Sequence, residues 1–123
     1  MIKFKDFQKL DIRVGTVIEA ERVEGSEKLL RLVVDLGHEK RQLISGIAKW
    51  YSPEDIINKQ FTMIINLEPR TIMGLGSQGM LLAVDPVNFD LADENTDTEI
   101  EVENLKPIFL VPDEKVPNGS KVV

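Results

Sequence analysis

The sequence predicts an all-β fold of five strongly curved strands, with one short helix between the third and fourth strands. Apolar and polar residues alternate over most of the first 84 residues, which is the period of a half-buried strand. Glycine and proline clusters separate the alternating segments, as turns do. A chain of 123 residues is long enough to bury one core, so we expect a single domain over residues 1–123.

The first 22 residues predict a short helix and then a long strand. The helix is predicted from apolar residues spaced three apart, namely Phe4, Phe7 and Leu10. From Asp11 the period becomes two, and the predicted core face of the strand holds Ile12, Val14, Ile18 and Ala20. Gly15 interrupts this strand, and we expect a bend or bulge there.

Residues 30–47 predict a hairpin of the second and third strands. The second strand alternates through Leu30, Leu32, Val34 and Leu36, which leaves Arg31 and Asp35 pointing outward. Gly37 and His38 form a tight connection into the third strand, residues 41–47. We expect Leu43, Ile44 and Ile47 of that strand to belong to the core.

The short helix is predicted to begin at Ser52, with Pro53 at its first position and acidic residues in its first turn. It has room for little more than two turns. The fourth strand follows over residues 61–67 and leads into a glycine-rich loop, residues 66–83. Residues 80–84 form the fifth strand as the chain leaves this loop.

The C-terminal residues predict two further short strands. One covers residues 108–111, and the other covers residues 120–123 after a turn at 117–119, so the fold has a C-terminal strand extension. Five curved strands with a helix after the third follow the order of an OB-fold barrel, which commonly binds oligonucleotides. A five-stranded sandwich has a similar pattern and stays open at this point.

The negative charge of the chain is concentrated in one segment. The formal net charge is −6, yet residues 85–106 hold 8 of the 21 acidic residues and 1 of the 15 basic ones. The rest of the chain has 14 basic and 13 acidic residues, so its balance does not argue against a polyanionic partner. We expect this acidic insertion to be a solvated loop, with a possible edge strand around Ile100 and Val102.

The chemistry of an enzyme is missing from the sequence. The single histidine, His38, follows a glycine in a turn, and the chain has no cysteine nucleophile and no phosphate-binding P-loop. No histidine–carboxylate pair has metal-ligand spacing, so we expect no catalytic residue, metal or cofactor. The lack of cysteine fits a cytoplasmic location, and no apolar run exceeds five residues, which is too short to cross a membrane.

The glycine-rich loop is the candidate binding element. Its glycines leave it without bulk, while Arg70, Ser77 and Gln78 supply hydrogen-bond donors and Met80 lies at its edge. Hydrogen-bond donors on such a loop are better suited to binding a polyanion than to catalysing a reaction. The alternative is a long hairpin loop that needs glycine only in order to turn.

Five motifs occur along the chain in a single order. They are Asp11-Ile12-Arg13-Val14-Gly15, Ser26-Glu27-Lys28-Leu29-Leu30, Ser45-Gly46-Ile47-Ala48, Asn66-Leu67-Glu68-Pro69-Arg70 and Ser77-Gln78-Gly79-Met80-Leu81-Leu82-Ala83. Together they resemble the tRNA-binding domain at the C-terminus of bacterial methionyl-tRNA synthetases. The same domain occurs as a free-standing protein or synthetase beta subunit, and in the endothelial monocyte-activating polypeptide II group. The resemblance covers residues 4–84 and resumes at 108–123.

The resemblance implies an OB-fold that binds tRNA by its shape, as a homodimer and as a non-catalytic subunit or accessory factor of methionyl-tRNA synthetase. Shape recognition uses phosphates, 2′-hydroxyls and exposed bases. The residues that match binding positions of the family are Asn66, Arg70, Ser77 and Met80. Supporting phosphate contacts are expected from Lys28, Arg31, Arg41 and Lys49, although Lys28 and Arg31 can simply solvate a strand face and Met80 can belong to the core.

This chain also departs from the family. Thr71, Ile72 and Met73 follow Arg70 where many relatives have further basic residues, and the acidic insertion replaces a short turn. A second interpretation is an export-related chaperone of the same fold, which the chain resembles at residues 58–60 and 116–119 and which binds unfolded polypeptides. A third is an assembly module that joins synthetases through residues 85–106.

Overall fold

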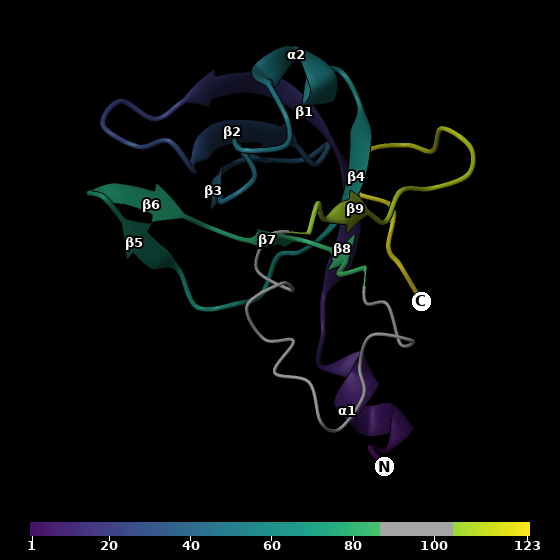
Figure 1. Cartoon of the computed structure of the whole chain (residues 1–123). Coiled ribbons are helices and arrows are strands. Elements are labelled where there is room, and N and C mark those ends of the chain that lie inside the picture. Colours follow the sequence, from purple (N-terminus) through teal and green to yellow (C-terminus); the bar gives the residue numbers. More distant parts are fainter. Residues whose placement is uncertain (87–104) are drawn as a thin grey trace.

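The computed structural model describes residues 1–86 and 105–123. Most of the acidic insertion, and the edge strand predicted within it, lies outside these residues. The elements in chain order are α1 (Phe4–Gln8), β1 (Ile12–Arg22), β2 (Leu30–Asp35), β3 (Lys40–Ser45), α2 (Pro53–Ile56), β4 (Gln60–Ile64), β5 (Arg70–Ile72), β6 (Leu75–Ser77), β7 (Met80–Leu81), β8 (Ala83–Val84) and β9 (Ile108–Phe109) (Figure 1). The predicted short helices at residue 4 and after residue 52 are both present.

Five strands form one antiparallel sheet in the order β3-β2-β1-β4-β7. The long strand β1 pairs with β4 over its first half and with β2 over its second half, which curls the sheet into a half barrel (Figure 1). The edges β3 and β7 approach each other, and the Gln78 N–H donates to the Gln42 carbonyl at 2.9 Å. The predicted all-β architecture, with its helix between the third and fourth strands, is confirmed.

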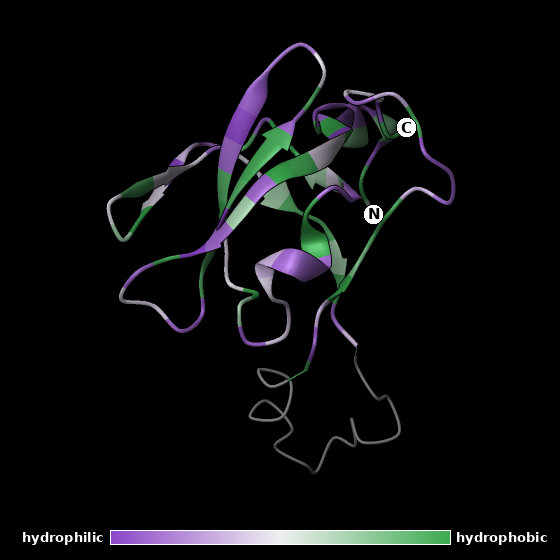
Figure 2. Cartoon of the chain, turned by 90° about the horizontal axis from the view of Figure 1, so that it is seen from above, coloured by the Kyte–Doolittle hydropathy of each residue, from purple (hydrophilic) through white to green (hydrophobic). Residues whose placement is uncertain are grey.

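The core lies inside the curl of the sheet. All four alternating residues predicted for the second strand are fully buried, and Leu43, Ile44 and Ile47 are buried as expected. Ile56 of α2 adds a fully buried side chain, which explains why so short a helix is retained. Figure 2 shows apolar residues along the strands of the curled sheet and hydrophilic residues in the loops at its rim.

The irregularity in β1 differs from the prediction. The register shifts between Val17 and Glu19, not at Gly15. Val17, before the shift, is 0% exposed, and Ala20, after the shift, packs against the core, so Ile18 lies between two core positions and is not a core residue. Position 15 requires glycine for another reason. A Cβ there would lie 2.5 Å from Cγ1 of Val34, so glycine allows β1 to pack closely on the side chains of β2.

The start of α2 follows the predicted capping pattern. The Ser52 N–H donates to the Asp55 carboxylate at 2.8 Å, and the Ser52 hydroxyl donates to the same oxygen at 3.0 Å. These bonds hold the pKa of Asp55 below its ordinary value. The backbone hydrogen bond of Glu54, with a smaller contribution from Ser52, lowers the pKa of Glu54 in the same way.

The end of the chain closes against β1. The Gly119 N–H donates to the Val14 carbonyl at 2.7 Å, and the Val122 N–H donates to the Ile12 carbonyl at 2.8 Å. The final strand predicted at 120–123 is reduced to a single bridge between Arg13 and Lys121.

The glycine-rich loop is more ordered than predicted. β4 ends at Ile64, so Leu67 is not a strand residue and is 42% exposed. The loop then folds back as the β5–β6 hairpin, with positive φ angles at Met73 and Gly74 in its turn. The fifth strand predicted over residues 80–84 is two short strands, because β7 pairs with β4 and β8 pairs with β9.

Candidate nucleic-acid interface

The β5–β6 hairpin forms its own two-stranded sheet and lies against β3 (Figure 1). Side chains fasten it to that strand. The Ile44 N–H donates to the Ser77 hydroxyl at 3.0 Å, and the Gln42 side-chain amide donates to the Gly76 carbonyl at 2.8 Å. These bonds hold the hairpin, and the residues on it, in a defined position relative to the sheet.

Three of the predicted binding residues line one small pocket beside this hairpin, namely Arg70, Ser77 and Met80. The pocket holds about 80 Å³ and is lined by Ile44, Leu67, Glu68, Arg70, Ile72, Ser77, Gly79 and Met80. Arg70 is exposed and Met80 is 48% exposed, so Met80 is not a core residue. Both side chains can meet a partner that approaches from solvent.

Ser77 has a different role from its neighbours in this pocket. It is 5% exposed, and its hydroxyl accepts from Ile44 and donates to the Gly79 carbonyl at 3.4 Å. A hydroxyl that is buried and bonded on both sides offers little to an external phosphate. Ser77 therefore holds β6 of the hairpin to β3 through its bond with Ile44.

Asn66 connects the end of β4 to the N-terminal segment. Its side-chain oxygen accepts from the Asp11 N–H at 2.8 Å, and its side-chain nitrogen donates to the Lys9 carbonyl at 2.6 Å. The residue is exposed, but both ends of its amide have partners within the chain. Asn66 does not line the pocket that holds Arg70.

Arg41 lies in β3 and reaches across to the glycine-rich loop. Its Nε donates to Glu39 at 2.8 Å, and its Nη1 donates to the carbonyls of Ile65 and Gln78, the latter at 3.3 Å. It lines a pocket of about 420 Å³ that shares Leu67 with the Arg70 pocket. The guanidinium therefore ties three segments of the chain together.

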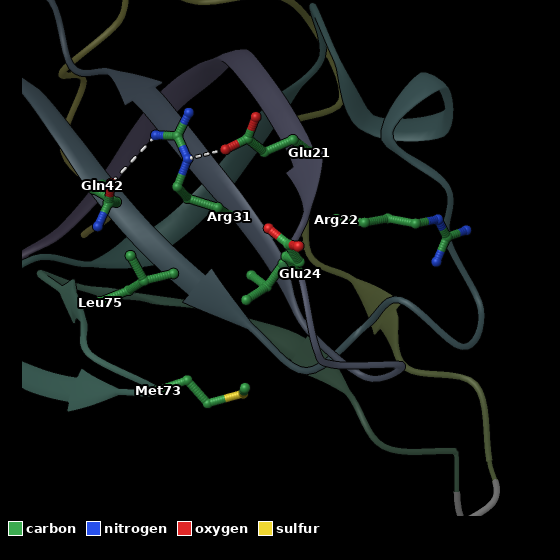
Figure 3. Close-up of a pocket in the computed structure, with 8 residues that line it drawn as sticks. Glu21, Arg22, Glu24, Arg31, Gln42, Met73 and Leu75 are labelled. Atoms are coloured by element: carbon green, nitrogen blue, oxygen red, sulfur yellow. Dashed lines mark hydrogen bonds and ion pairs between the residues drawn. The ribbon is translucent and has the colours of Figure 1, made fainter.

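Arg31 lines the largest of these pockets, about 660 Å³, between the outer face of the sheet and the tip of the hairpin (Figure 3). Its Nε donates to Glu21 at 2.6 Å and its Nη2 donates to Glu19 at 3.4 Å. The hydrogen bond to Glu21 raises the pKa of Arg31. Two carboxylates thus neutralise this guanidinium, and Glu24 adds another acid to the pocket lining.

Lys28 and Lys49 are exposed on neighbouring loops. The Ala48 N–H donates to the Lys28 carbonyl at 3.0 Å, which joins the loop after β1 to the segment after β3. The two lysines therefore lie on adjoining segments, although neither lines the Arg70 pocket.

Gln42 is the residue of this region that the sequence analysis did not single out. It is one outward polar residue among several in β3, and only its contacts with β2 and β6 distinguish it. His38 is exposed in its turn, 3.8 Å from Glu39. Within residues 1–86 and 105–123, no group of acidic or histidine side chains could hold a metal, and no helix has the length and apolar character of a membrane span.

Residues 12–121 match the family described as "Putative tRNA binding domain". The methionine–tRNA ligase of Methanothrix thermoacetophila is 49% identical over 119 residues, which is 97% of this chain and 15% of that protein. The chain therefore spans only about 15% of the length of this relative.

Two crystal structures share the fold over the whole chain. A MetRS-related protein from Pyrococcus horikoshii is 31% identical with a TM-score of 0.82, covering 100% of this chain and 98% of that one. The chaperone CsaA from Bacillus anthracis is 30% identical with a TM-score of 0.79, covering 100% and 99%. With a family match over residues 12–121 and nearly half of its residues shared with a methionine–tRNA ligase, this chain belongs to the tRNA-binding domain family.

Proposed function

We propose that this protein binds tRNA through the surface around Arg70 and Met80, with Lys28 and Lys49 as further phosphate contacts. The observation that carries the proposal is the exposed Arg70 on a hairpin whose position is fixed by hydrogen bonds to β3. An arginine pairs with phosphate, and the exposed thioether of Met80 offers an apolar contact for a base. Recognition of this kind reads the shape of a folded RNA.

The same proposal assigns Arg31, Arg41, Asn66 and Ser77 to the support of this surface. Each donates or accepts hydrogen bonds within the chain, so its effect on tRNA would be indirect. We propose that the protein acts in the cytoplasm as a non-catalytic subunit or accessory factor of a methionyl-tRNA synthetase. Its similarity to a part of methionine–tRNA ligases supports this role.

A homodimer is part of the proposal. Helix α1 has no buried residue; Phe4, at 67% exposed, and Phe7 lie on its surface, and Leu10 just after the helix is also exposed. A five-residue helix is not stable by itself in water, so an apolar cover for this face would stabilise it. Sedimentation equilibrium should give twice the mass of the chain, and Phe4→Ser should shift the protein to the monomer.

The chaperone is the second candidate function. It is supported by the CsaA structure from Bacillus anthracis and by exposed apolar residues at the hairpin, among them Met73 in its turn and Leu67 before it. A chaperone would use these residues to bind unfolded polypeptides. A role as an assembly module through residues 85–106 would instead show as loss of a synthetase partner, with tRNA binding retained, when that segment is deleted.

One competition experiment separates the two main candidates. Labelled total tRNA is titrated with the protein in the presence and absence of an excess of a permanently unfolded protein. We expect tRNA binding that the unfolded protein does not displace. Capture of the unfolded protein, with no binding of tRNA, would overturn the proposal in favour of the chaperone. Deletion of residues 85–106 should strengthen tRNA binding at low salt, because it removes 8 acidic residues.

A further inference from the structure

A continuous chain of polar side chains crosses the outer face of the sheet and ends at the hairpin. The Arg31 Nε donates to Glu21 at 2.6 Å, and the Arg31 Nη1 donates to the side-chain oxygen of Gln42 at 3.2 Å (Figure 3). The side-chain nitrogen of Gln42 then donates to the Gly76 carbonyl at 2.8 Å. These three bonds link β1, β2, β3 and β6.

The strand register places the three side chains of this hydrogen-bonded network, those of Glu21, Arg31 and Gln42, beside one another. Glu21 of β1 lies directly opposite Arg31 of β2. Gln42 of β3 lies opposite Val33, one diagonal step from Arg31 on the same face, which is within reach of a long side chain. The chain of contacts therefore follows from the pairing of the sheet.

Donor and acceptor chemistry determines how Gln42 is oriented. A carboxylate only accepts and a guanidinium only donates, so Arg31 can meet only the oxygen of the Gln42 amide. The nitrogen of that amide must then point the other way, where the Gly76 carbonyl can accept from it. Reversing the amide would set donor against donor and acceptor against acceptor.

The position of Gly76 determines the position of Arg70. In the hairpin, Gly76 pairs with Thr71, and Ser77 pairs with Arg70. A shift of β6 away from β3 would therefore carry Arg70 with it. Three other hydrogen bonds hold this end of the hairpin: the Ile44 N–H donates to the Ser77 hydroxyl, the Gln78 N–H donates to the backbone carbonyl of Gln42, and Arg41 Nη1 donates to the Gln78 carbonyl at 3.3 Å. The bond from the Gln42 side chain is the one that holds Gly76 itself.

We propose that Gln42, oriented by Arg31 and Glu21, is a positioning residue for tRNA binding that holds the β5–β6 hairpin so that Arg70 meets the RNA. This inference rests on the proposed tRNA-binding function. Arg31 acts here from within the protein, through Gln42, and not as a phosphate contact.

The test is a double-mutant cycle on tRNA affinity with Gln42→Met and Arg70→Ala. Methionine keeps the length of the side chain and removes both amide contacts. We expect Gln42→Met to weaken tRNA binding by about 2- to 10-fold, the range for one hydrogen bond, and to have little further effect once Arg70 is alanine. Gln60→Met is the matched control, because Gln60 also donates to a backbone carbonyl, that of Val116, at 2.6 Å, but away from the hairpin.

A second variant separates the two possible roles of Arg31. Arg31→Lys keeps the positive charge but loses the planar guanidinium that holds Glu21 and Gln42 together. It should weaken tRNA binding about as much as Gln42→Met, with no further loss when the two changes are combined. If Arg31→Lys binds tRNA as tightly as the unmodified chain, the charge of residue 31 is sufficient and the inference is overturned.

Amide hydrogen exchange gives a readout that needs no RNA. The amides of residues 71–77 should exchange faster in Gln42→Met than in the unmodified chain, and Gln60→Met should leave them unchanged. Unchanged exchange in Gln42→Met, or tRNA affinities in which Gln42→Met and Arg70→Ala add, would overturn the positioning role while tRNA binding stands. Absence of tRNA binding by the unmodified chain would instead overturn the proposed function itself, and this role with it.

Discussion

Removing the Ser77 hydroxyl should destabilise the protein without removing a contact to RNA. In Ser77→Ala the buried Ile44 N–H loses its acceptor, which is 3.0 Å away, and no water can reach it easily. A buried donor without a partner costs about 1–3 kcal/mol. The second bond of the hydroxyl, to the Gly79 carbonyl, is 3.4 Å long and should add little.

The free energy of unfolding is measured by chemical denaturation for Ser77→Ala and for Ser120→Ala. Ser120 also donates to a carbonyl, that of Pro117, at 2.6 Å, but at an exposed site, so its loss should stay within about 0.5 kcal/mol. The salt dependence of tRNA binding should be the same for Ser77→Ala and the unmodified chain. Unchanged stability, together with a weaker salt dependence, would refute this reasoning and make Ser77 a direct contact.

Three further predictions concern the fold. Gly15→Ala should lower the free energy of unfolding by about 1–3 kcal/mol, because its methyl group would overlap Val34, whereas Gly46→Ala, which meets nothing within 4 Å, should not. Asp55→Asn should lower the denaturant midpoint at neutral pH. Since the folded-state pKa of Asp55 is lowered, the difference from the unmodified chain should be full above about pH 4 and disappear as pH falls through that lowered pKa. A difference that stays the same at all pH values would contradict this. Asn66→Ala should speed hydrogen exchange at the Asp11 amide, and unchanged exchange there would contradict the connecting role of Asn66.

The strands of this fold could be predicted because their side-chain period reports burial directly. Leu30, Leu32, Val34 and Leu36 alternate in the sequence and are buried in the structure. The same reasoning missed Val17 and wrongly assigned Ile18 to the core, because it applied one alternation to the whole of β1. The register shift between Val17 and Glu19 puts the residues before and after it in different phases, and it leaves no mark in composition. The β5–β6 hairpin was missed because its two strands have three residues each, too few for a period to show.

The candidate site could be predicted only in part, because the sequence gives the type of a side chain but not its partners. Arg31 is bonded to Glu21, 10 residues away, through the register of β1 with β2, and Arg41 to Ile65, 24 residues away, through the curl of the sheet that brings β3 near the segment after β4. Of the residues predicted to bind on the glycine-rich loop, Arg70, Ser77 and Met80 line one pocket and Asn66 does not, and their contact with tRNA stays a prediction. That Ser77 points inward while Arg70 and Met80 are exposed is determined by the docking of the hairpin on β3.

The most direct test of tRNA binding through Arg70 is the salt dependence of binding in the unmodified chain, Arg70→Ala and Lys115→Ala. Each phosphate contact contributes roughly −0.7 to −0.9 to the slope of log affinity against log salt. The unmodified chain should show a clear negative slope, and Arg70→Ala should bind more weakly with a slope smaller by about one contact. Lys115→Ala, which removes one exposed charge from the C-terminal loop, should keep the slope. Equal slopes and affinities for all three proteins would contradict the account.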